Sequence, residues 1–217
     1  MPPTDKFFDR IAAQLANLKQ HLTGQRTATS ARDRADNDRL PATRATRSGQ
    51  SPQRILFVCM GNICRSPLAE GIARAMAQKQ GLATRLIFDS AGTHGQMHSG
   101  SPPDARAQRV AARHGYDLSK LRARTVIDAD FDRFDRILVM DSANLGELQR
   151  RCPLGSQGKL ALFLDYADSL VEKDVPDPYY GTDEGFERVL GLCEQAVQGL
   201  LSRLASETAV ARANPAE

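Results

Sequence analysis

The chain lacks several patterns that would place it in other classes of protein. No stretch of its 217 residues approaches the ~20 consecutive apolar residues of a membrane-spanning helix. The amino terminus has no charged-then-apolar layout typical of a secretory signal, and Asp5 and Asp9 do not suit a transit peptide. The sequence therefore predicts a cytoplasmic protein.

Metal-binding spacing is also missing. The four histidines are scattered through the chain, and no Cys-x2-Cys pair occurs. Structural zinc sites need such closely spaced ligands, so we expect neither a metal nor a cofactor. The four cysteines are Cys59, Cys64, Cys152 and Cys193.

The net charge of +3 is small and unevenly distributed. Residues 1–53 contain nine Lys/Arg and five Asp, which gives +4, and the remaining 20 basic and 21 acidic residues give −1. No arginine cluster is interleaved with aromatic residues, so we expect no nucleic-acid partner.

The first 53 residues divide into two segments. Apolar residues at helical spacing, from Phe7 to Leu22, predict an amphipathic helix over residues 1–23. Residues 24–53 are rich in Arg, Asp, Thr, Ala and Ser without periodicity, which predicts a disordered linker. The helix could bind a partner, self-associate, dock on its own domain or be dispensable. Its mixed charge disfavours a membrane surface.

The most informative stretch is the loop from Cys59 to Ser66, with the sequence Cys-Met-Gly-Asn-Ile-Cys-Arg-Ser. The apolar residues before it predict a buried strand over 54–58. Ser66 as the N-cap and Pro67 as the first helical residue predict a helix that ends before Gly81. A loop between the carboxyl end of a strand and the amino end of a helix directs N–H groups and the helix dipole at one anion.

The ends of this loop distinguish it from a nucleotide-binding loop, which closes on Gly-Lys-Ser/Thr. Cys59 would lie beneath the anion, and Arg65 could hold two phosphate oxygens at once. The N–H groups, the helix dipole and Arg65 all favour a thiolate. The sequence therefore predicts a cysteine nucleophile under a phosphoryl group. The alternative for an isolated Cys-x5-Arg, a buried cysteine beside a surface arginine, is disfavoured by the flanking strand and helix signals.

From residue 54 onward strands and helices alternate. Further strands are predicted at residues 86–90, 135–140 and 159–164, and helices at 102–114, 142–150 and about 183–205. This order predicts an α/β fold, a four-stranded parallel sheet with helices on both faces and a ligand site at the carboxyl ends of the strands. We expect the domain to span residues 54–206, and residues 207–217 to form a disordered tail.

Catalysis by a thiolate also requires an acid that protonates the leaving oxygen. The candidate is Asp177, in a loop with a proline on each side. Taken alone, Asp-Pro is also typical of a plain turn.

Three stretches resemble the low-molecular-weight protein tyrosine phosphatases, including their bacterial members. They are residues 58–70 (Val-Cys-Met-Gly-Asn-Ile-Cys-Arg-Ser-Pro-Leu-Ala-Glu), 89–93 (Asp-Ser-Ala-Gly-Thr) and 177–181 (Asp-Pro-Tyr-Tyr-Gly). The resemblance covers about residues 54–204 and implies the flavodoxin-like strand order 2-1-3-4. It also implies hydrolysis of phosphotyrosine in proteins through a phosphocysteine, with a bacterial tyrosine kinase as one candidate partner.

The same resemblance implies individual roles. Cys59 would be the nucleophile, Arg65 would bind phosphate, and Asp177 would act as general acid and then as general base. Cys64 would be a redox guard that forms a reversible disulfide with Cys59. The residues implied to bind phosphate or line the pocket are Met60, Gly61, Asn62, Ile63, Cys64, Ser66, Tyr179 and Tyr180. Ser90 would support the loop with Asn62, and Asp141 could either pair with Arg65 or cap the helix that follows it.

Two features bear on the substrate. Ile63 occupies the position where related phosphoarginine phosphatases carry threonine, and its apolar side chain favours an aryl group. Residues 94–99 lack the aromatic residue usual in the family, so Met97 could supply a softer wall. Two alternatives remain: a protein-arginine phosphatase of the same fold, and a phosphate-binding or interaction module whose functional element is the N-terminal helix.

Overall fold

The computed structural model describes residues 51–168 and 170–213. The helix predicted over residues 1–23 lies outside the described residues. The predicted linker also lies outside them, from residue 24 to residue 50. Gln53, which was predicted to end the linker, already belongs to the first strand. None of the helices in these described ranges is long and apolar enough to cross a membrane.

A four-stranded parallel sheet forms the centre of the domain. Its strands are β1 (Gln53–Cys59), β2 (Leu86–Gly92), β3 (Arg136–Val139) and β4 (Leu160–Leu162). They pair in the order β2-β1-β3-β4, and each pairing is parallel. The predicted fold class and strand order are therefore confirmed. The central strand β1 is fully buried from Ile55 to Val58, as a continuous apolar run in a parallel sheet requires.

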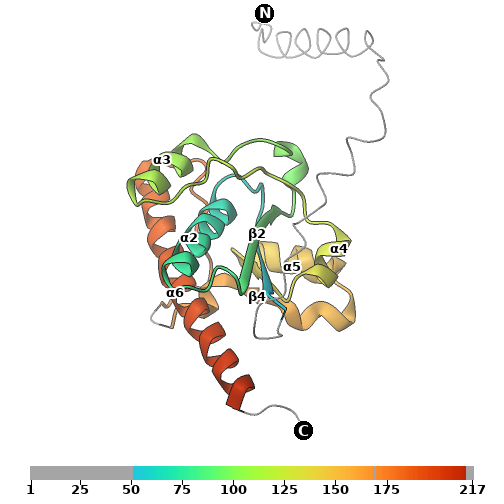
Figure 1. Ribbon diagram of the computed structural model, residues 1–217. Helices are drawn as coiled ribbons and strands as arrows, with labels where there is room; N and C mark the ends of the chain where they lie inside the picture. The colour runs from blue at the N-terminus through green and yellow to red at the C-terminus, as the bar shows by residue number, and fades with distance from the viewer. Residues whose placement is uncertain (1–50, 169, 214–217) are drawn as a thin grey trace, which may run out of the picture. The chain divides into compact units, whose positions relative to one another are not determined.

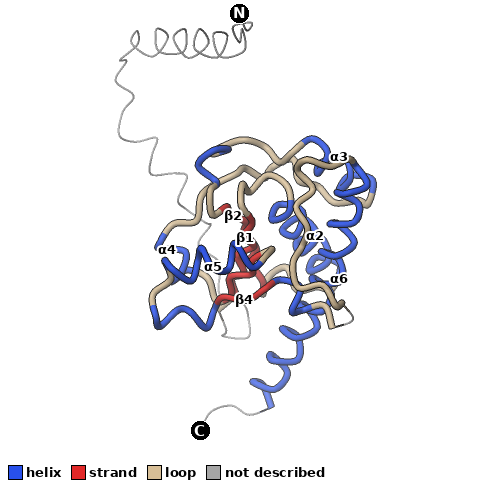
Figure 2. Tube along the Cα trace, turned by 180° about the vertical axis from the view of Figure 1, so that it is seen from behind, coloured by secondary structure: helices blue, strands red, loops and turns tan. Residues whose placement is uncertain are grey.

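Helices cover both faces of the sheet (Figures 1 and 2). On one side lie α2 (Arg65–Lys79), α3 (Ala105–Arg113) and α6 (Asp183–Ala213), and on the other lie α4 (Asp128–Arg133) and α5 (Ser142–Arg151). The largest part of the core fills the space between the sheet and α2 and α6. There the Phe57 ring packs edge-on against the Phe163 ring, with 5.1 Å between centroids.

The start of α2 differs from the prediction. Ser66 was expected to cap this helix, but α2 begins at Arg65 and the N-cap position is Cys64, which makes no side-chain capping bond. The Ser66 hydroxyl is instead directed into the loop, where it contacts Cys59 and Asn62. The prediction that the helix ends before Gly81 is confirmed, and Gly81 has a φ of 69°, which suits glycine.

Two apolar segments were misjudged. The strand predicted over residues 159–164 ends at Leu162, and Phe163–Tyr166 forms a short 3-10 helix that buries Phe163 in the core. A short apolar run cannot by itself distinguish a strand from a buried helical turn. The helix α4 was not predicted, because its six residues contain only one large apolar side chain, Phe131.

The carboxyl terminus was also predicted incorrectly. The tail expected over residues 207–217 is helical as far as Ala213, because α6 continues eight residues beyond Ala205. Residues 206–213 contain neither glycine nor proline, and Arg136 on β3 binds both carboxylate oxygens of Glu207 at 2.7 Å. Residues 214–217 lie outside the described ranges.

Candidate active site

The loop between β1 and α2 surrounds the sulfur of Cys59 with hydrogen-bond partners. The backbone N–H of Asn62 donates to Cys59 Sγ at 3.3 Å, and Ser66 Oγ lies 3.0 Å from the same sulfur. Cys59 is the last residue of β1 and is buried. The backbone N–H of Asn62, the Ser66 hydroxyl and the amino end of α2 are thus gathered around one sulfur atom.

Asn62 fixes the shape of the loop. Its φ is 57°, and it is the one non-glycine residue with a positive φ among the residues that the structure describes. Its side-chain amide donates to Ser66 Oγ and Ser90 Oγ, both at 2.9 Å, and its carbonyl oxygen accepts from Arg124 N at 2.9 Å. An asparagine tolerates the left-handed conformation, and these three bonds hold it there. The geometry thus brings Asn62 and Ser90 together, as the family resemblance implied, and adds Ser66 to the same network.

The end of β2 braces the loop from the side. Thr93 N donates to Cys59 O at 2.9 Å, and His94 N donates to Met60 O at 2.8 Å. At Gly92 a Cβ atom would lie 2.6 Å from Met60 O, so a larger residue would push the loop away. The glycine of the Asp-Ser-Ala-Gly-Thr stretch is thus explained by a close backbone approach.

Two residues that the sequence analysis did not identify, Glu70 and Arg74, support Asn62 through Ser90. Ser90 Oγ donates to Glu70 Oε2 at 2.7 Å, and Arg74 Nε donates to the other oxygen of this carboxylate at 2.8 Å. Burial raises the pKa of Glu70, and the charge of Arg74 partly opposes that shift. Glu70 lies inside the stretch that carries the family resemblance, which was the available signal.

Arg124 also supports the loop, and no local pattern in the sequence pointed to it. Its guanidinium donates to Asp89 Oδ2 and Asp130 Oδ2, both at 2.8 Å, while its backbone N–H reaches Asn62. Asp89 lies on β2 and Asp130 on α4. Through its backbone and its side chain together, Arg124 therefore ties the loop of residues 59–66 to β2 and α4.

Arg65 connects the loop to two distant carboxylates. Its Nη1 donates to Asp141 Oδ2 at 2.6 Å and to Val175 O at 3.0 Å, and its Nη2 donates to Asp177 Oδ2 at 2.9 Å. Burial lowers the pKa of Arg65, but the neighbouring Cys59, Asp177 and Asp141 outweigh burial and raise it overall. The guanidinium is therefore a permanent positive charge beside Cys59.

Asp141 satisfies both of the alternatives left open by the sequence. While Oδ2 pairs with Arg65, Oδ1 accepts the backbone N–H of Asn144 at 2.7 Å and caps α5. One carboxylate at the end of β3 thus fixes the guanidinium and begins a helix.

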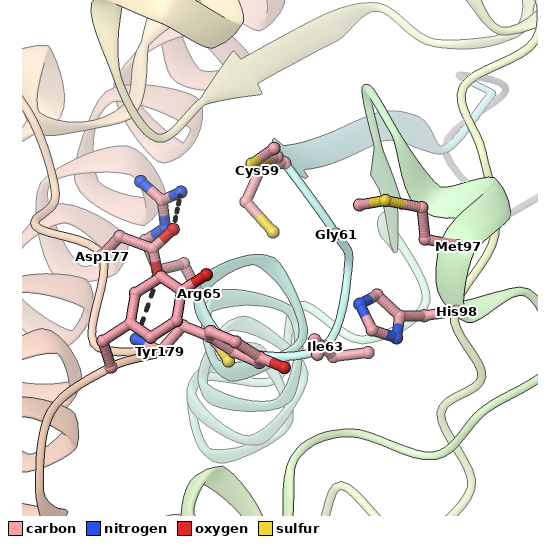
Figure 3. A pocket seen from close by; sticks show the side chains of 11 residues that line it. Cys59, Gly61, Ile63, Arg65, Met97, His98, Asp177 and Tyr179 are labelled. Carbon is pink, nitrogen blue, oxygen red and sulfur yellow. Dashed lines mark hydrogen bonds and ion pairs between the residues drawn. The ribbon is translucent and has the colours of Figure 1, made fainter. Parts of the chain in front are cut away.

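Cys59, Arg65 and Asp177 line one pocket of about 350 Å³ (Figure 3). Asp177 and Tyr179 stand on one side of Cys59 and Gly61, and Met97 and His98 stand on the other. Asn62 and Ser66, which were expected in the pocket lining, belong to the loop but do not line the pocket. The lining residues are Cys59, Met60, Gly61, Ile63, Cys64, Arg65, Met97, His98, Asp177, Tyr179 and Tyr180.

A 3-10 helix at Gly95–His98 forms the wall opposite the tyrosines. It brings Met97 to the pocket, as the sequence suggested, and also His98, which the sequence analysis did not identify. The His98 ring lies over the loop, so that a Cβ atom on Gly61 would be 3.2 Å from His98 Cδ2. Residues 94–99 gave no periodic signal that could have predicted this.

Cys64 faces the same pocket as a free thiol, as does Cys59. Burial raises the pKa of the Cys64 thiol well above its usual range, and the charge of Asp104 adds to this shift. Cys64 is therefore held as a neutral thiol, whereas the sulfur of Cys59 lies within hydrogen-bond distance of Asn62 N and Ser66 Oγ. Cys193 is buried in the core.

The chain is similar to characterised proteins over this same domain. A family model described as low molecular weight phosphotyrosine protein phosphatase matches residues 54–210. A Bacillus subtilis relative named low molecular weight protein-tyrosine-phosphatase YfkJ is 40% identical over 153 residues, which is 70% of this chain and 96% of the relative. A Streptomyces coelicolor low molecular weight protein-tyrosine-phosphatase is 41% identical over 152 residues, 69% of this chain and 92% of the relative.

A solved structure has the same arrangement of elements. The crystal structure of a protein tyrosine phosphatase from Entamoeba histolytica, with Hepes in its active site, superposes with a TM-score of 0.69. It is 38% identical in sequence, and the match covers 72% of this chain and 99% of the other. The range matched by the family model, residues 54–210, agrees with the range indicated by the three sequence motifs.

Proposed function

This chain belongs to the low molecular weight phosphotyrosine protein phosphatase family, and we propose that it hydrolyses phosphotyrosine in proteins through a phosphocysteine on Cys59. One observation carries the mechanism. Cys59 Sγ accepts the backbone N–H of Asn62 and opens, together with Arg65 and Asp177, onto one pocket. A nucleophile, a phosphate ligand and a candidate acid are therefore within reach of one phosphoryl group.

In the first step the phosphate occupies the loop, and Arg65 donates to two of its oxygens. The thiolate of Cys59 attacks phosphorus, an S–P bond forms, and the bond from phosphorus to the phenolic oxygen breaks. Asp177 gives its proton to that oxygen, so that tyrosine leaves as a neutral phenol.

In the second step the roles of Asp177 and Cys59 reverse. The Asp177 carboxylate takes a proton from water, the water oxygen attacks phosphorus, and the S–P bond breaks to release inorganic phosphate. Ser66 Oγ, 3.0 Å from the sulfur, is placed to donate to the departing thiolate.

The Arg65–Asp177 contact suggests how substrate binding prepares the acid. Nη2 of Arg65 donates to Asp177 in this structure, and phosphate oxygens are competing acceptors for the same N–H groups. When Arg65 turns to the phosphate, the Asp177 carboxyl is released toward the leaving oxygen. Arg65 keeps its bond to Asp141, which holds the guanidinium at the pocket.

The walls of the pocket favour an aryl group next to the phosphate. Tyr179 on one side and Met97 on the other provide an aromatic and a polarisable surface, and Ile63 provides an apolar one. Aromatic rings pack well against such surfaces. The substrate class that fits is phosphotyrosine in an exposed segment of a protein, and a tyrosine kinase that phosphorylates itself is one such partner.

Catalysis requires reduced Cys59, so we place the enzyme in the cytoplasm, where thiols are kept reduced. Under oxidation Cys64, a free thiol on the same pocket, would form a disulfide with Cys59 and protect it from irreversible oxidation.

The test is a comparison of kcat/KM on three peptides that differ only in the phosphorylated residue: phosphotyrosine, phosphoserine and phosphoarginine. We expect phosphotyrosine to be hydrolysed fastest, and a metal chelator to leave that rate unchanged. A higher kcat/KM on phosphoarginine would instead support the protein-arginine phosphatase alternative. Phosphate binding without turnover of any peptide would support the binding-module alternative.

A further inference from the structure

We propose that Arg106 is a positioning residue that holds the loop of Asp177 over the phosphate-binding loop. Neither the sequence motifs nor the pocket lining includes this residue. The inference rests on the proposed function, because it assumes that Asp177 acts as the acid.

The guanidinium of Arg106 is fixed by a neighbouring carboxylate. Arg106 Nε donates to Asp104 Oδ1 at 3.0 Å, and Nη2 donates to Asp104 Oδ2 at 2.8 Å, which forms a two-pronged ion pair. Asp104 Oδ1 also accepts the backbone N–H of Arg106 at 2.8 Å and so caps α3. These contacts lower the pKa of Asp104 and keep it charged. The orientation of the guanidinium is therefore set at the first turn of a helix.

From this position Arg106 reaches the acid loop. Its Nη1, the nitrogen not used by Asp104, donates to Gly181 O at 2.9 Å. Its Cζ lies 4.8 Å from the centre of the Phe186 ring and 5.9 Å from the centre of the Tyr179 ring. Phe186 is fully buried in α6, so the guanidinium rests on the hydrophobic core while it holds the loop.

The same turn of the chain is also tied to the phosphate loop. Asp104 N donates to Ile63 O at 2.8 Å. Residues 104–106 therefore form a bracket, with Asp104 bonded to the loop that binds phosphate and Arg106 bonded to the loop that carries the acid. The distance between the two loops is set by this one helical turn.

The bracket matters because the other side-chain hydrogen bond to the acid loop (residues 176–181), from Arg65 to Asp177, is broken during catalysis. Two side chains from elsewhere in the described residues donate hydrogen bonds into residues 176–181: Arg65 to Asp177, and Arg106 to Gly181. Phosphate binding withdraws Arg65 from Asp177, as argued above. The upstream end of the loop remains fixed, because buried Val175 donates to Met140 O at 2.7 Å. Arg106 is then the side chain that still donates a hydrogen bond into residues 176–181, ahead of the start of α6 at Asp183.

The experiment replaces Arg106 with methionine and measures kcat/KM for a series of aryl phosphates with leaving groups of decreasing basicity. A displaced acid slows substrates with basic leaving groups most, since activated phenolates depart without a proton. We expect a loss of roughly 10-fold on phosphotyrosine and less than about 2-fold on the most activated substrate, because misplaced catalytic groups lose effective concentration. A plot of log kcat/KM against leaving-group pKa should become steeper.

The matched control is Arg109→Met on the same helix. Arg109 pairs with Asp183 Oδ1 at 2.9 Å, at the start of α6, and makes no recorded bond to residues 176–181. Its variant loses an arginine and an ion pair between α3 and α6 but should keep the slope of the native enzyme. Arg106→Lys keeps the charge but not the two-pronged geometry, so it should give an intermediate slope.

Two outcomes would overturn the inference: the Arg106→Met line shifts in parallel without a change of slope, or it coincides with the Arg109→Met line. If Arg106→Met does not fold, Arg106→Lys and Asp104→Asn decide the question by the same slope. Asp177→Asn separates this failure from failure of the proposed function. If Asp177→Asn leaves the slope unchanged, the acid assignment is wrong; if it steepens the slope but no bracket variant does, the bracket is wrong.

Discussion

The two loops that meet in the pocket are held in very different ways. The phosphate loop, residues 59–66, is held by buried hydrogen bonds. Asn62 is 1% exposed, and its side chain bonds to α2, to β2 and to the segment that contains Arg124. In the acid loop the Asp177 side chain is 46% exposed and Tyr180 is 97% exposed. The phosphoryl group is therefore bound by a rigid loop, whereas the leaving group meets a loop that few hydrogen bonds hold in place.

The largest expected effect comes from removing the nucleophile at the centre of the rigid loop. Cys59→Ser should reduce turnover of phosphotyrosine by on the order of 10⁴-fold or more, as removal of a covalent nucleophile does in other enzymes. Because the N–H groups and Arg65 remain, phosphate should still bind, measurable by calorimetry or as competitive inhibition of substrate binding. Simultaneous loss of phosphate binding would mean that the sulfur supports the loop rather than the chemistry.

A smaller effect should follow from loosening the rigid loop without touching the nucleophile. Asn62→Gly keeps the positive φ but removes the bonds to Ser66, Ser90 and Arg124, whereas Asn62→Ala removes the same bonds and adds backbone strain. We expect both variants to lower kcat/KM by roughly 100-fold, from about three buried hydrogen bonds at ~1 kcal/mol each. Alanine should lower the melting temperature further than glycine.

The Asn62 pair tests which property of asparagine matters. Nearly native activity in Asn62→Gly would show that the conformation alone suffices. Equal melting temperatures for the two variants would show that the positive φ costs little at this position.

Much of the rigid loop could be predicted from the sequence, because its signals are local. An apolar run, a turn and a helix start follow one another within residues 54–67, and they place Cys59, Asn62 and Arg65 in one loop. Asp177 joined them only through the family resemblance, since it lies 112 residues from Arg65. An isolated Asp-Pro gives no physical indication of a partner so far away.

The supporting residues could not be predicted, because each acts through contacts between distant segments. Arg124 binds Asp89, 35 residues away, and Arg106 reaches Gly181 across 75 residues. Both arginines look like ordinary surface charges in the sequence. His98 was missed for a related reason: its short 3-10 helix leaves no periodic pattern, and only the fold brings it against Gly61.

Substitutions in the exposed acid loop should have milder effects than those in the phosphate loop, and these effects should fall on substrate binding. Tyr179 lines the pocket and is partly covered by Arg106, whereas Tyr180 is almost fully exposed and contacts Tyr179 edge-on. Tyr179→Leu should raise KM for a phosphotyrosyl peptide by roughly 5-fold, consistent with the ~1 kcal/mol of an aromatic contact. Tyr180→Leu should raise KM less, and steady-state kinetics of the two variants measures the difference directly. A larger effect from Tyr180 would place the substrate ring at the exposed rim of the pocket rather than against Tyr179.

The smallest effect concerns stability and pH at the bracket. The ion pair with Arg106 lowers the pKa of Asp104 in the folded protein, so its stabilising contribution is present above the unfolded value and is lost as the pH falls through the folded one. Asp104→Asn keeps a good helix cap but removes the charge. The difference in unfolding free energy between native enzyme and this variant should therefore shrink below about pH 4, near the ordinary pKa of aspartate. A constant difference measured by urea denaturation across that range would contradict the ion pair.

The central claim is that the sulfur of Cys59 takes the phosphoryl group, and trapping that species tests it most directly. The enzyme would be mixed with a phosphotyrosyl peptide labelled in its phosphate, quenched within the first turnover, and digested for mass spectrometry. The account predicts phosphate bound to the peptide that contains Cys59, at the sulfur of that residue, and none in Cys59→Ser. Phosphate on Cys64 or His98, or release of tyrosine without any phosphorylated enzyme, would contradict it.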